Sequence, residues 1–187
     1  MTGYFWSEDA SRILYVQDKG GNENYHIYAV DPAAAAEPAT GVPPARDLTP
    51  IDGVTAQILA VPEENPGRIL VGLNDRDPRY HDVYWLDLAS GERELVFRNE
   101  ENIAGWLTDH DGELRLALRI DDEGATRILR RDGERLTEIY SCTVEETCYP
   151  IAFKPDGSRA YMVTDKGDVN LSRFVLIDPA TGATELV

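Results

Sequence analysis

Two polar stretches of the chain carry side chains that could bind a ligand: "DKGGNENYH" at residues 18–26 and "NDRDPRYH" at residues 74–81. They gather carboxylate, carboxamide and guanidinium groups, which donate or accept hydrogen bonds and form strong charged pairs. The candidate binding residues are Asn22, Glu23 and Asn24 in the first stretch and Asn74, Arg76 and Asp77 in the second.

A structural interpretation accounts for the same residues. Asn and Asp side chains commonly cap turns by accepting hydrogen bonds from nearby backbone amides. Arg76 could pair locally with Asp77 or Asp75. This structural interpretation is favoured over binding. The two interpretations differ in whether the side chains form hydrogen bonds within the chain or remain available to a ligand.

The adjacent carboxylates of Glu145 and Glu146 could together accept hydrogen bonds from an ammonium group. Adjacent glutamates also occur at 63–64 and 100–101, so such pairs are common in this acidic chain. A solvated loop is therefore the favoured interpretation of Glu145 and Glu146.

The histidines and cysteines predict no metal site and no catalytic base. The three histidines lie in or beside loops of different repeats, at His26, His81 and His110. Five residues separate Cys142 from Cys148, which is not a usual zinc-ligand spacing. Two reduced, partly buried thiols are favoured over a loop disulfide, and no cofactor is expected.

A repeated spacing indicates which elements position these residues. Eighteen residues separate Ile13 from Asp31, and the same interval separates residues 69 and 87, 114 and 132, and 160 and 178. The steps between copies are 56, 45 and 46 residues. Two landmarks that keep one interval through four copies predict four structural repeats.

Each copy has four short segments rich in Val, Ile, Leu, Tyr and Trp, separated by Gly, Pro, Asp and Asn turns. Four-stranded units of about 45 residues are typical of a β-propeller. We predict an all-β domain over residues 1–187 with four antiparallel four-stranded blades, as part of a larger ring or as a small closed ring. The approximate blade bounds are 3–53, 54–101, 102–147 and 148–187, and residues 32–45 form a surface loop.

Loops of such blades alternate between two faces. The loops that join second to third strands share one face, here called the mouth face, with the loops that join one blade to the next. Both polar stretches belong to it, together with segments 97–103, 121–126, 142–148 and 165–170. Loops held by a rigid scaffold often carry binding residues, which favours this face as the functional one.

The composition excludes several classes of partner. The formal net charge is −16, from 34 acidic and 18 basic residues, and a field of that sign repels nucleic acid and anionic lipid. No apolar run approaches the roughly eighteen residues of a membrane span. The first residues lack the basic start and apolar stretch of a signal peptide, so a cytoplasmic location is expected.

Four segments in order resemble the propeller of prolyl-oligopeptidase-family (S9) serine peptidases. They are "YVQDKGGNENYHIYAVD", "RDLTPIDGV", "ILVGLNDRDPRYHDVYWLDLASGE" and "FRNEENIAGWLTDHDG". The resemblance is greatest to the acylaminoacyl-peptidase and dipeptidyl-aminopeptidase branch and is strongest over residues 4–112. The chain departs from the family at Asn22, where an acidic residue often follows the glycine pair.

The resemblance implies a C-terminal α/β-hydrolase domain with a Ser-Asp-His triad, whose serine lies on a Gly-x-Ser-x-Gly turn. None of the serines here has glycine at both flanking positions: Ser7, Ser11, Ser90, Ser141, Ser158 and Ser172. We therefore expect no catalytic residue in this chain and a serine peptidase as its parent. The implied role is to admit short peptides and to dock the hydrolase domain, with the six candidate residues contacting that domain or a peptide.

Two other functions remain open at this point. The blade pattern alone fits a stand-alone interaction scaffold equally well, and propeller glycosidases use inward carboxylates as acid and base. No pair of carboxylates in the sequence is distinguished as the acid and base of a glycosidase. If the four blades belong to a larger ring, the two end blades expose apolar faces, which predicts a homodimer unless the ring closes on itself.

Overall fold

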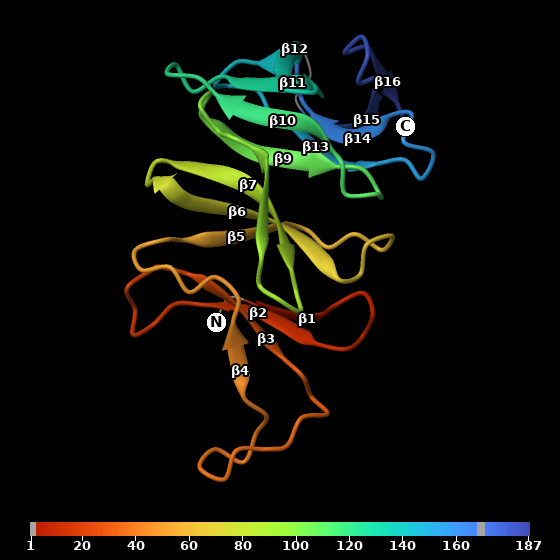
Figure 1. The fold of residues 1–187 in the computed structure, drawn as a ribbon. Coiled ribbons are helices and arrows are strands. Elements are labelled where there is room, and N and C mark those ends of the chain that lie inside the picture. The colour runs from red at the N-terminus through yellow and green to blue at the C-terminus, as the bar shows by residue number, and fades with distance from the viewer. Residues whose placement is uncertain (1–2, 168–170) are drawn as a thin grey trace. The chain divides into compact units, whose positions relative to one another are not determined.

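The computed structural model describes residues 3–167 and 171–187, and these form β-strands, turns and loops without a helix (Figure 1). Four antiparallel sheets are present, each with four strands in chain order. The prediction of an all-β propeller with four four-stranded blades is confirmed. The end of the predicted 165–170 loop, residues 168–170, lies outside the described residues.

The backbone contacts divide the chain into two compact units, Met1–Asn99 and Glu100–Val187. The first unit holds two sheets and one shared apolar core, which includes Leu14, Ile27, Ile69 and Leu86. Its strands are β1 (Gly3–Trp6), β2 (Ile13–Gln17), β3 (His26–Val30), β4 (Ala45–Asp47), β5 (Ala56–Ala60), β6 (Arg68–Asp77), β7 (Tyr80–Asp87) and β8 (Arg93–Phe97).

The second unit repeats this arrangement. Its two sheets bury a core that includes Leu116, Ile128, Met162 and Ile177. Its strands are β9 (Ile103–Thr108), β10 (Leu114–Ile120), β11 (Thr126–Asp132), β12 (Arg135–Cys142), β13 (Cys148–Phe153), β14 (Ala160–Thr164), β15 (Arg173–Ile177) and β16 (Thr184–Leu186).

Three aspartates of the eighteen-residue spacing, Asp31, Asp87 and Asp178, cap the turn between the third and fourth strands. The carboxylate of Asp87 accepts hydrogen bonds from the amides of Ala89 and Ser90, and that of Asp178 accepts one from the amide of Ala180. Such side-chain caps pre-organise a tight reversal. The spacing therefore marks the hairpin at the outer end of a blade.

Within each unit, an arginine of one blade holds this hairpin in the next blade. Arg46 of β4 donates to the carbonyl oxygens of Ala89 and Ser90. In the second unit, Arg130 of β11 donates to the carbonyl oxygen of Ala180 over 3.0 Å. These contacts fix the blades of a pair against each other at their outer ends.

Gly182 lies against the neighbouring blade of the second unit. Its φ is +73°, and a Cβ atom at this position would lie 1.8 Å from the carbonyl oxygen of Ile139 in β12. A glycine is needed here for two reasons, the left-handed backbone and the absence of space.

Gly182→Ala should therefore lower the free energy of unfolding by about 2–4 kcal/mol, because strain from the positive φ and the clash with backbone add together. Gly133→Ala is the matched control, since Gly133 also has a positive φ of +64° but nothing within 4 Å of its Cβ position. Urea denaturation of both variants measures the difference. Equal destabilisation by the two substitutions would show that the blade contact is not tight.

Candidate functional site

The first candidate stretch forms its own capped turn. The Oδ1 atom of Asn22 accepts hydrogen bonds from the amides of Asn24 at 3.1 Å and Lys19 at 3.4 Å. The amide of Glu23 donates to Asp18 at 3.2 Å, and Glu23 adopts a left-handed φ of 61°. Asn22 thus shapes the loop, while the side chain of Glu23 stays exposed to solvent.

Thr55 connects the two candidate stretches on the mouth face. Its hydroxyl donates to the carbonyl oxygen of Glu23 over 3.2 Å, and its amide donates to Oδ1 of Asn74 over 2.6 Å. The Nδ2 group of Asn74 donates in turn to the carbonyl oxygen of Pro78. The structure therefore brings Glu23 and Asn74 to the start of the same strand, β5.

The carboxylate of Asp77 is hydrogen-bonded to Arg79 within the same turn. Its carboxylate accepts hydrogen bonds from the amide, Nε and Nη2 of Arg79 at 2.8–3.0 Å. These contacts with the Arg79 side chain and backbone lower the pKa of Asp77 to about 2. Asp77 remains ionised over the physiological range and stabilises the turn that joins β6 to β7.

Arg76 holds a buried carboxylate. Its Nε and Nη2 atoms lie 2.7 and 2.9 Å from the two oxygens of Asp82, and Nη2 also donates to the carbonyl oxygen of Asn99. Asp82 accepts a further bond from the amide of Asn99 at 2.8 Å. The structural interpretation named Asp77 or Asp75 as the partner of Arg76. The structure shows the guanidinium reaching across the hairpin to Asp82.

The protonation of Asp82 depends on this pairing. Burial raises the pKa of Asp82, but the hydrogen bonds from Arg76 and from the amide of Asn99 outweigh burial and hold the pKa below its ordinary value. The charged form of Asp82 is therefore the one that stabilises the fold. The binding role of the six candidates stays a prediction, with Glu23 the one that offers a carboxylate free of hydrogen bonds to described residues.

Arg76→Gln should lower the free energy of unfolding by about 2–4 kcal/mol near neutral pH, because it leaves a buried carboxylate without its charged partner. A group with a depressed pKa stabilises above its ordinary pKa, about 3.9 for aspartate, and the contribution is lost as pH falls through the folded value. The difference between Arg76→Gln and the parent chain should consequently shrink as the pH falls below about 4 and through the lowered pKa of Asp82.

Arg79→Gln serves as the control for this measurement, since the Arg79 side chain is exposed and its pair with Asp77 is screened by solvent. We expect no measurable change in its urea midpoint. A pH-independent difference for Arg76→Gln would rule out the charged pair as the cause.

Asn22 and Asn24 line a polar recess of about 220 Å³ on the first blade, together with Lys19, His26, Tyr28, Asp47, Pro50, Asp52 and Gly53. Within it, Nδ1 of His26 lies 2.7 Å from a carboxylate oxygen of Asp47. The sequence offered no signal for this pair, because the two residues are on strands β3 and β4 and meet only through strand pairing.

The other two histidines make separate contacts. The Nε2 atom of His81 is buried without a hydrogen-bond partner among the described residues, and burial lowers the pKa of His81. The Nε2 atom of His110 lies 3.3 Å from the carbonyl oxygen of Phe153. In the parts of the chain that the structure covers, no group of His, Cys, Asp or Glu side chains could hold a metal ion.

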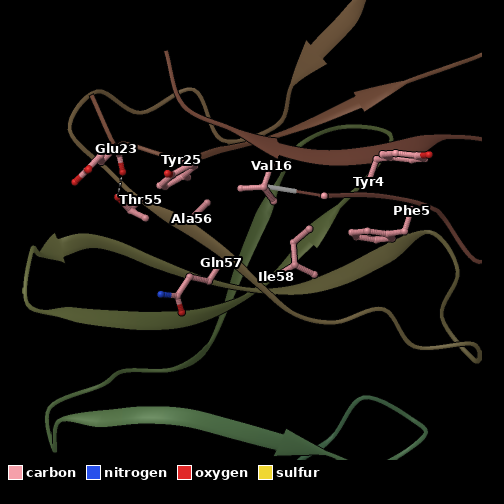
Figure 2. Close-up of a pocket in the computed structure, with 10 residues that line it drawn as sticks. Tyr4, Phe5, Val16, Glu23, Tyr25, Thr55, Ala56, Gln57 and Ile58 are labelled. Atoms are coloured by element: carbon pink, nitrogen blue, oxygen red, sulfur yellow. Dashed lines mark hydrogen bonds between the residues drawn. The ribbon is translucent and has the colours of Figure 1, made fainter. Parts of the chain in front are cut away.

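A larger recess of about 650 Å³ lies between the first strands of the two sheets of the first unit, β1 and β5 (Figure 2). Phe5, Val16, Ala56 and Ile58 supply apolar surface, and Tyr25, Thr55 and Glu23 lie at one end. Of the six candidates only Glu23 lines it. The sequence analysis missed this recess because it needs two strands that are about fifty residues apart.

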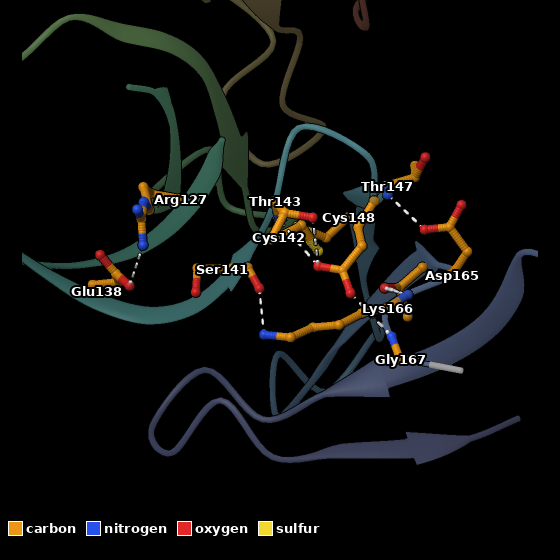
Figure 3. Close-up of a disulfide and its surroundings, with 12 residues drawn as sticks. Arg127, Glu138, Ser141, Cys142, Thr143, Thr147, Cys148, Asp165, Lys166 and Gly167 are labelled. Carbon is orange, nitrogen blue, oxygen red and sulfur yellow. Dashed lines mark hydrogen bonds and ion pairs between the residues drawn. A yellow bond between two sulfur atoms is a disulfide. The ribbon is translucent and has the colours of Figure 1, made fainter. Parts of the chain in front are cut away.

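Cys142 and Cys148 form a disulfide, with Cα atoms 6.0 Å apart (Figure 3). The expectation of two reduced thiols was therefore wrong. The bond joins the end of β12 to the start of β13, where both residues are buried in the apolar core of the second unit. Disulfides are typical of oxidising compartments, so this bond does not favour the cytoplasmic location, which stays a prediction.

The loop closed by this disulfide is held internally (Figure 3). The carboxylate of Glu146 accepts hydrogen bonds from the amide of Thr143 at 3.0 Å and from that of Gly167 at 3.1 Å. The bond from the Thr143 amide, and then that from Gly167, lower the pKa of Glu146. Glu146 is thus engaged by the fold, and Glu145 is the solvated member of the pair.

The described residues include no helix long and apolar enough to cross a membrane.

No protein-family model matches the sequence. The fold defines the chain as a β-propeller, and solved structures agree. A puromycin-hydrolysing peptidase from Mycobacterium tuberculosis superposes with a TM-score of 0.62 at 16% identity, covering 98% of this chain and 28% of that one. TolB from Acinetobacter baumannii superposes with a TM-score of 0.60 at 17% identity, covering 98% and 42%.

Sequence similarity identifies the kind of propeller. The chain is 38% identical over 187 residues to dipeptidyl aminopeptidase BIII of Pseudoxanthomonas mexicana, which covers 98% of this chain and 26% of that protein. The resemblance to the propeller region of prolyl-oligopeptidase-family (S9) serine peptidases is confirmed. The chain spans about a quarter of the length of this relative.

Proposed function

We propose that this chain is the non-catalytic propeller portion of a serine peptidase, which admits short peptides to the active site and docks a C-terminal α/β-hydrolase domain. The observation that carries the proposal is the end-to-end match to about a quarter of dipeptidyl aminopeptidase BIII. The remaining three quarters of that relative leave room for the hydrolase domain that the resemblance implies.

The mouth face of the first unit suits a rim that selects by exclusion. Contacts among Arg76, Asp82 and Asn99 tie the end of β6 to the end of the second blade, and Thr55 ties the neighbouring loops together. Loops held by buried hydrogen bonds resist displacement by a large substrate. In this proposal the rim therefore excludes folded proteins, while the exposed Glu23 is available to a peptide or to the hydrolase domain.

An interaction scaffold is the second candidate function. The superposition on TolB favours it, because the whole chain matches a propeller whose name does not describe a peptidase. That likeness is in fold alone, at 17% identity. The much higher identity to an aminopeptidase makes the peptidase role the stronger proposal.

The proposal predicts that the purified 187-residue chain releases no 4-nitroaniline from dipeptidyl-4-nitroanilides, because the bond-cutting residues lie in another domain. A chimera of dipeptidyl aminopeptidase BIII, with this chain in place of the matching quarter, should cleave such substrates and should spare a folded protein such as ubiquitin.

Two results would count against this role. Substantial hydrolysis by the isolated chain would place catalytic groups within it. A folded chimera that remains inactive, while the same enzyme with its own propeller is active, would show that this chain cannot dock the hydrolase domain and would favour the scaffold function.

The outward faces of the first and last blades expose aromatic side chains that a second copy of the chain could cover. Tyr4 and Trp6 project from the first blade on the side opposite its core partner, with exposed fractions of 72% and 53%. On the last blade Tyr149 and Phe174 are exposed, and Phe174 stacks on Tyr161. In the 187-residue chain we propose that a second copy covers these faces.

Light scattering coupled to size-exclusion chromatography should therefore report a dimer of the 20.8 kDa chain. Replacement of both Tyr4 and Trp6 by Ser should shift it toward the monomer, because these aromatic rings would supply much of the buried apolar area. Val42→Ser, which removes an exposed apolar side chain elsewhere, is the control. A parent chain that elutes as a monomer at high concentration would exclude the dimer.

A further inference from the structure

The recess between β1 and β5 has the dimensions of a ligand site and no assigned occupant. Its volume of about 650 Å³ falls within the roughly 300–1,000 Å³ of small-molecule sites. Phe5 and Ile58 face each other across it (Figure 2). An apolar side chain placed there would be desolvated on both sides, which favours binding.

Both strands beside the recess have a free edge. β1 and β5 are the first strands of their sheets, so each pairs with a neighbour on one side only. The amide of Ala56 points away from β6 and is already taken by the carbonyl oxygen of Tyr25, so the open part of the β5 edge begins after this amide. Because backbone groups alternate in an antiparallel pair, the amide and carbonyl of Ile58 also point away from β6.

The hydrogen bonds of β1 likewise show which of its backbone groups point away from β2. The amide of Ser7 donates to the carbonyl oxygen of Arg12 in the turn that leads to β2. Backbone groups alternate in direction along an antiparallel strand. In the register of β1 with β2, the amides and carbonyls of Tyr4 and Trp6 therefore point away from β2. A row of donors and acceptors thus borders the recess at strand spacing.

These edges carry neither charge nor proline against added strands. Natural proteins guard free edges with charged residues, proline or bulges. The sequence of β1 is Gly-Tyr-Phe-Trp, and that of β5 is Ala-Gln-Ile-Leu-Ala. Neither contains a charge or a proline, although β5 has a register shift after Ile58. An accessible edge without charge or proline, next to an apolar recess, is the chemistry that recognises an extended peptide.

Charge favours a basic peptide. The chain carries a net charge of −16, and the exposed Glu23 lies at the end of the recess, beside Thr55 and Tyr25. A field of this sign raises the local concentration of cations and their rate of association. An acidic peptide would meet the opposite effect.

We propose that this recess binds an extended basic peptide, which adds a strand along the free edge of β5 and inserts one apolar side chain between Phe5 and Ile58. The inference rests on the proposed role in selecting peptides and names where the propeller holds them. It differs from docking of the hydrolase domain, for which the mouth-face loops are the candidates.

The probe is fluorescein-labelled Lys-Thr-Leu-Thr-Lys-amide, titrated with the purified 187-residue chain and followed by fluorescence anisotropy. We expect saturable binding that weakens at least tenfold when Leu is replaced by Gly. N-methylation of one alternate set of peptide amides should weaken binding at least tenfold, and N-methylation of the other set should have a smaller effect. That alternation is the signature of strand addition.

Ile58→Glu should weaken binding at least tenfold by placing a charge in the recess. Trp6→Ala is the matched control, because Trp6 lies on β1 but its side chain is on the opposite face of the sheet, and binding should be unchanged. The peptide changes need no protein variant, so the test stands even if Ile58→Glu fails to fold.

Absence of saturable binding, or equal binding of both N-methylated peptides and of the Gly peptide, would overturn the proposal. These readouts involve no catalysis. An active, size-selective chimera combined with no peptide binding would therefore remove this inference and leave the proposed function standing. Peptide binding combined with an inactive chimera would support this inference and count against the proposed function.

Discussion

Burial of one face of a four-stranded sheet against the face of its neighbour is the constraint on which this molecule depends. A sheet of three-to-ten-residue strands cannot desolvate enough apolar surface alone, so it needs a second layer. Leu14 and Ile27 of the first blade meet Ile69 and Leu86 of the second in one core. The pairing is repeated between the third and fourth blades. Everything on the mouth face is positioned by these two cores.

The cores fix the strands, and buried polar contacts then fix the loops. Asp82 is almost inaccessible, and its charged form is favoured because Arg76 and the amide of Asn99 satisfy its oxygens. The second unit uses another means, since a disulfide and the carboxylate of Glu146 close the connection between its two blades. In both units the loops are therefore held by contacts that the fold itself supplies.

The repeat could be predicted because it follows from local chemistry. An apolar strand residue and a turn-capping aspartate such as Asp87 or Asp178 keep a constant interval whenever two strands and their loop have constant length. The turn-forming role of Asn22 follows from the same local rule, since an asparagine caps the amide two residues later.

Contacts between distant segments could not be predicted in this way. The pair of His26 with Asp47 depends on the register of β3 with β4, and the recess depends on how β1 lies beside β5. Arg76 has three acidic residues within six positions, and its contact with Asp82 follows from the pairing of β6 with β7 rather than from spacing. Sequence spacing names the candidates, whereas strand pairing decides among them.

The arginines that reach from one blade to the outer hairpin of the next have a consequence for motion. A hairpin end normally frays first, because its last hydrogen bonds face water. Arg46 and Arg130 anchor those ends to a neighbouring sheet, so local opening of the second or fourth blade must also break a contact with its predecessor. We therefore expect amide exchange with solvent to be coupled in pairs of blades, with two blades rather than one as the smallest cooperative unit.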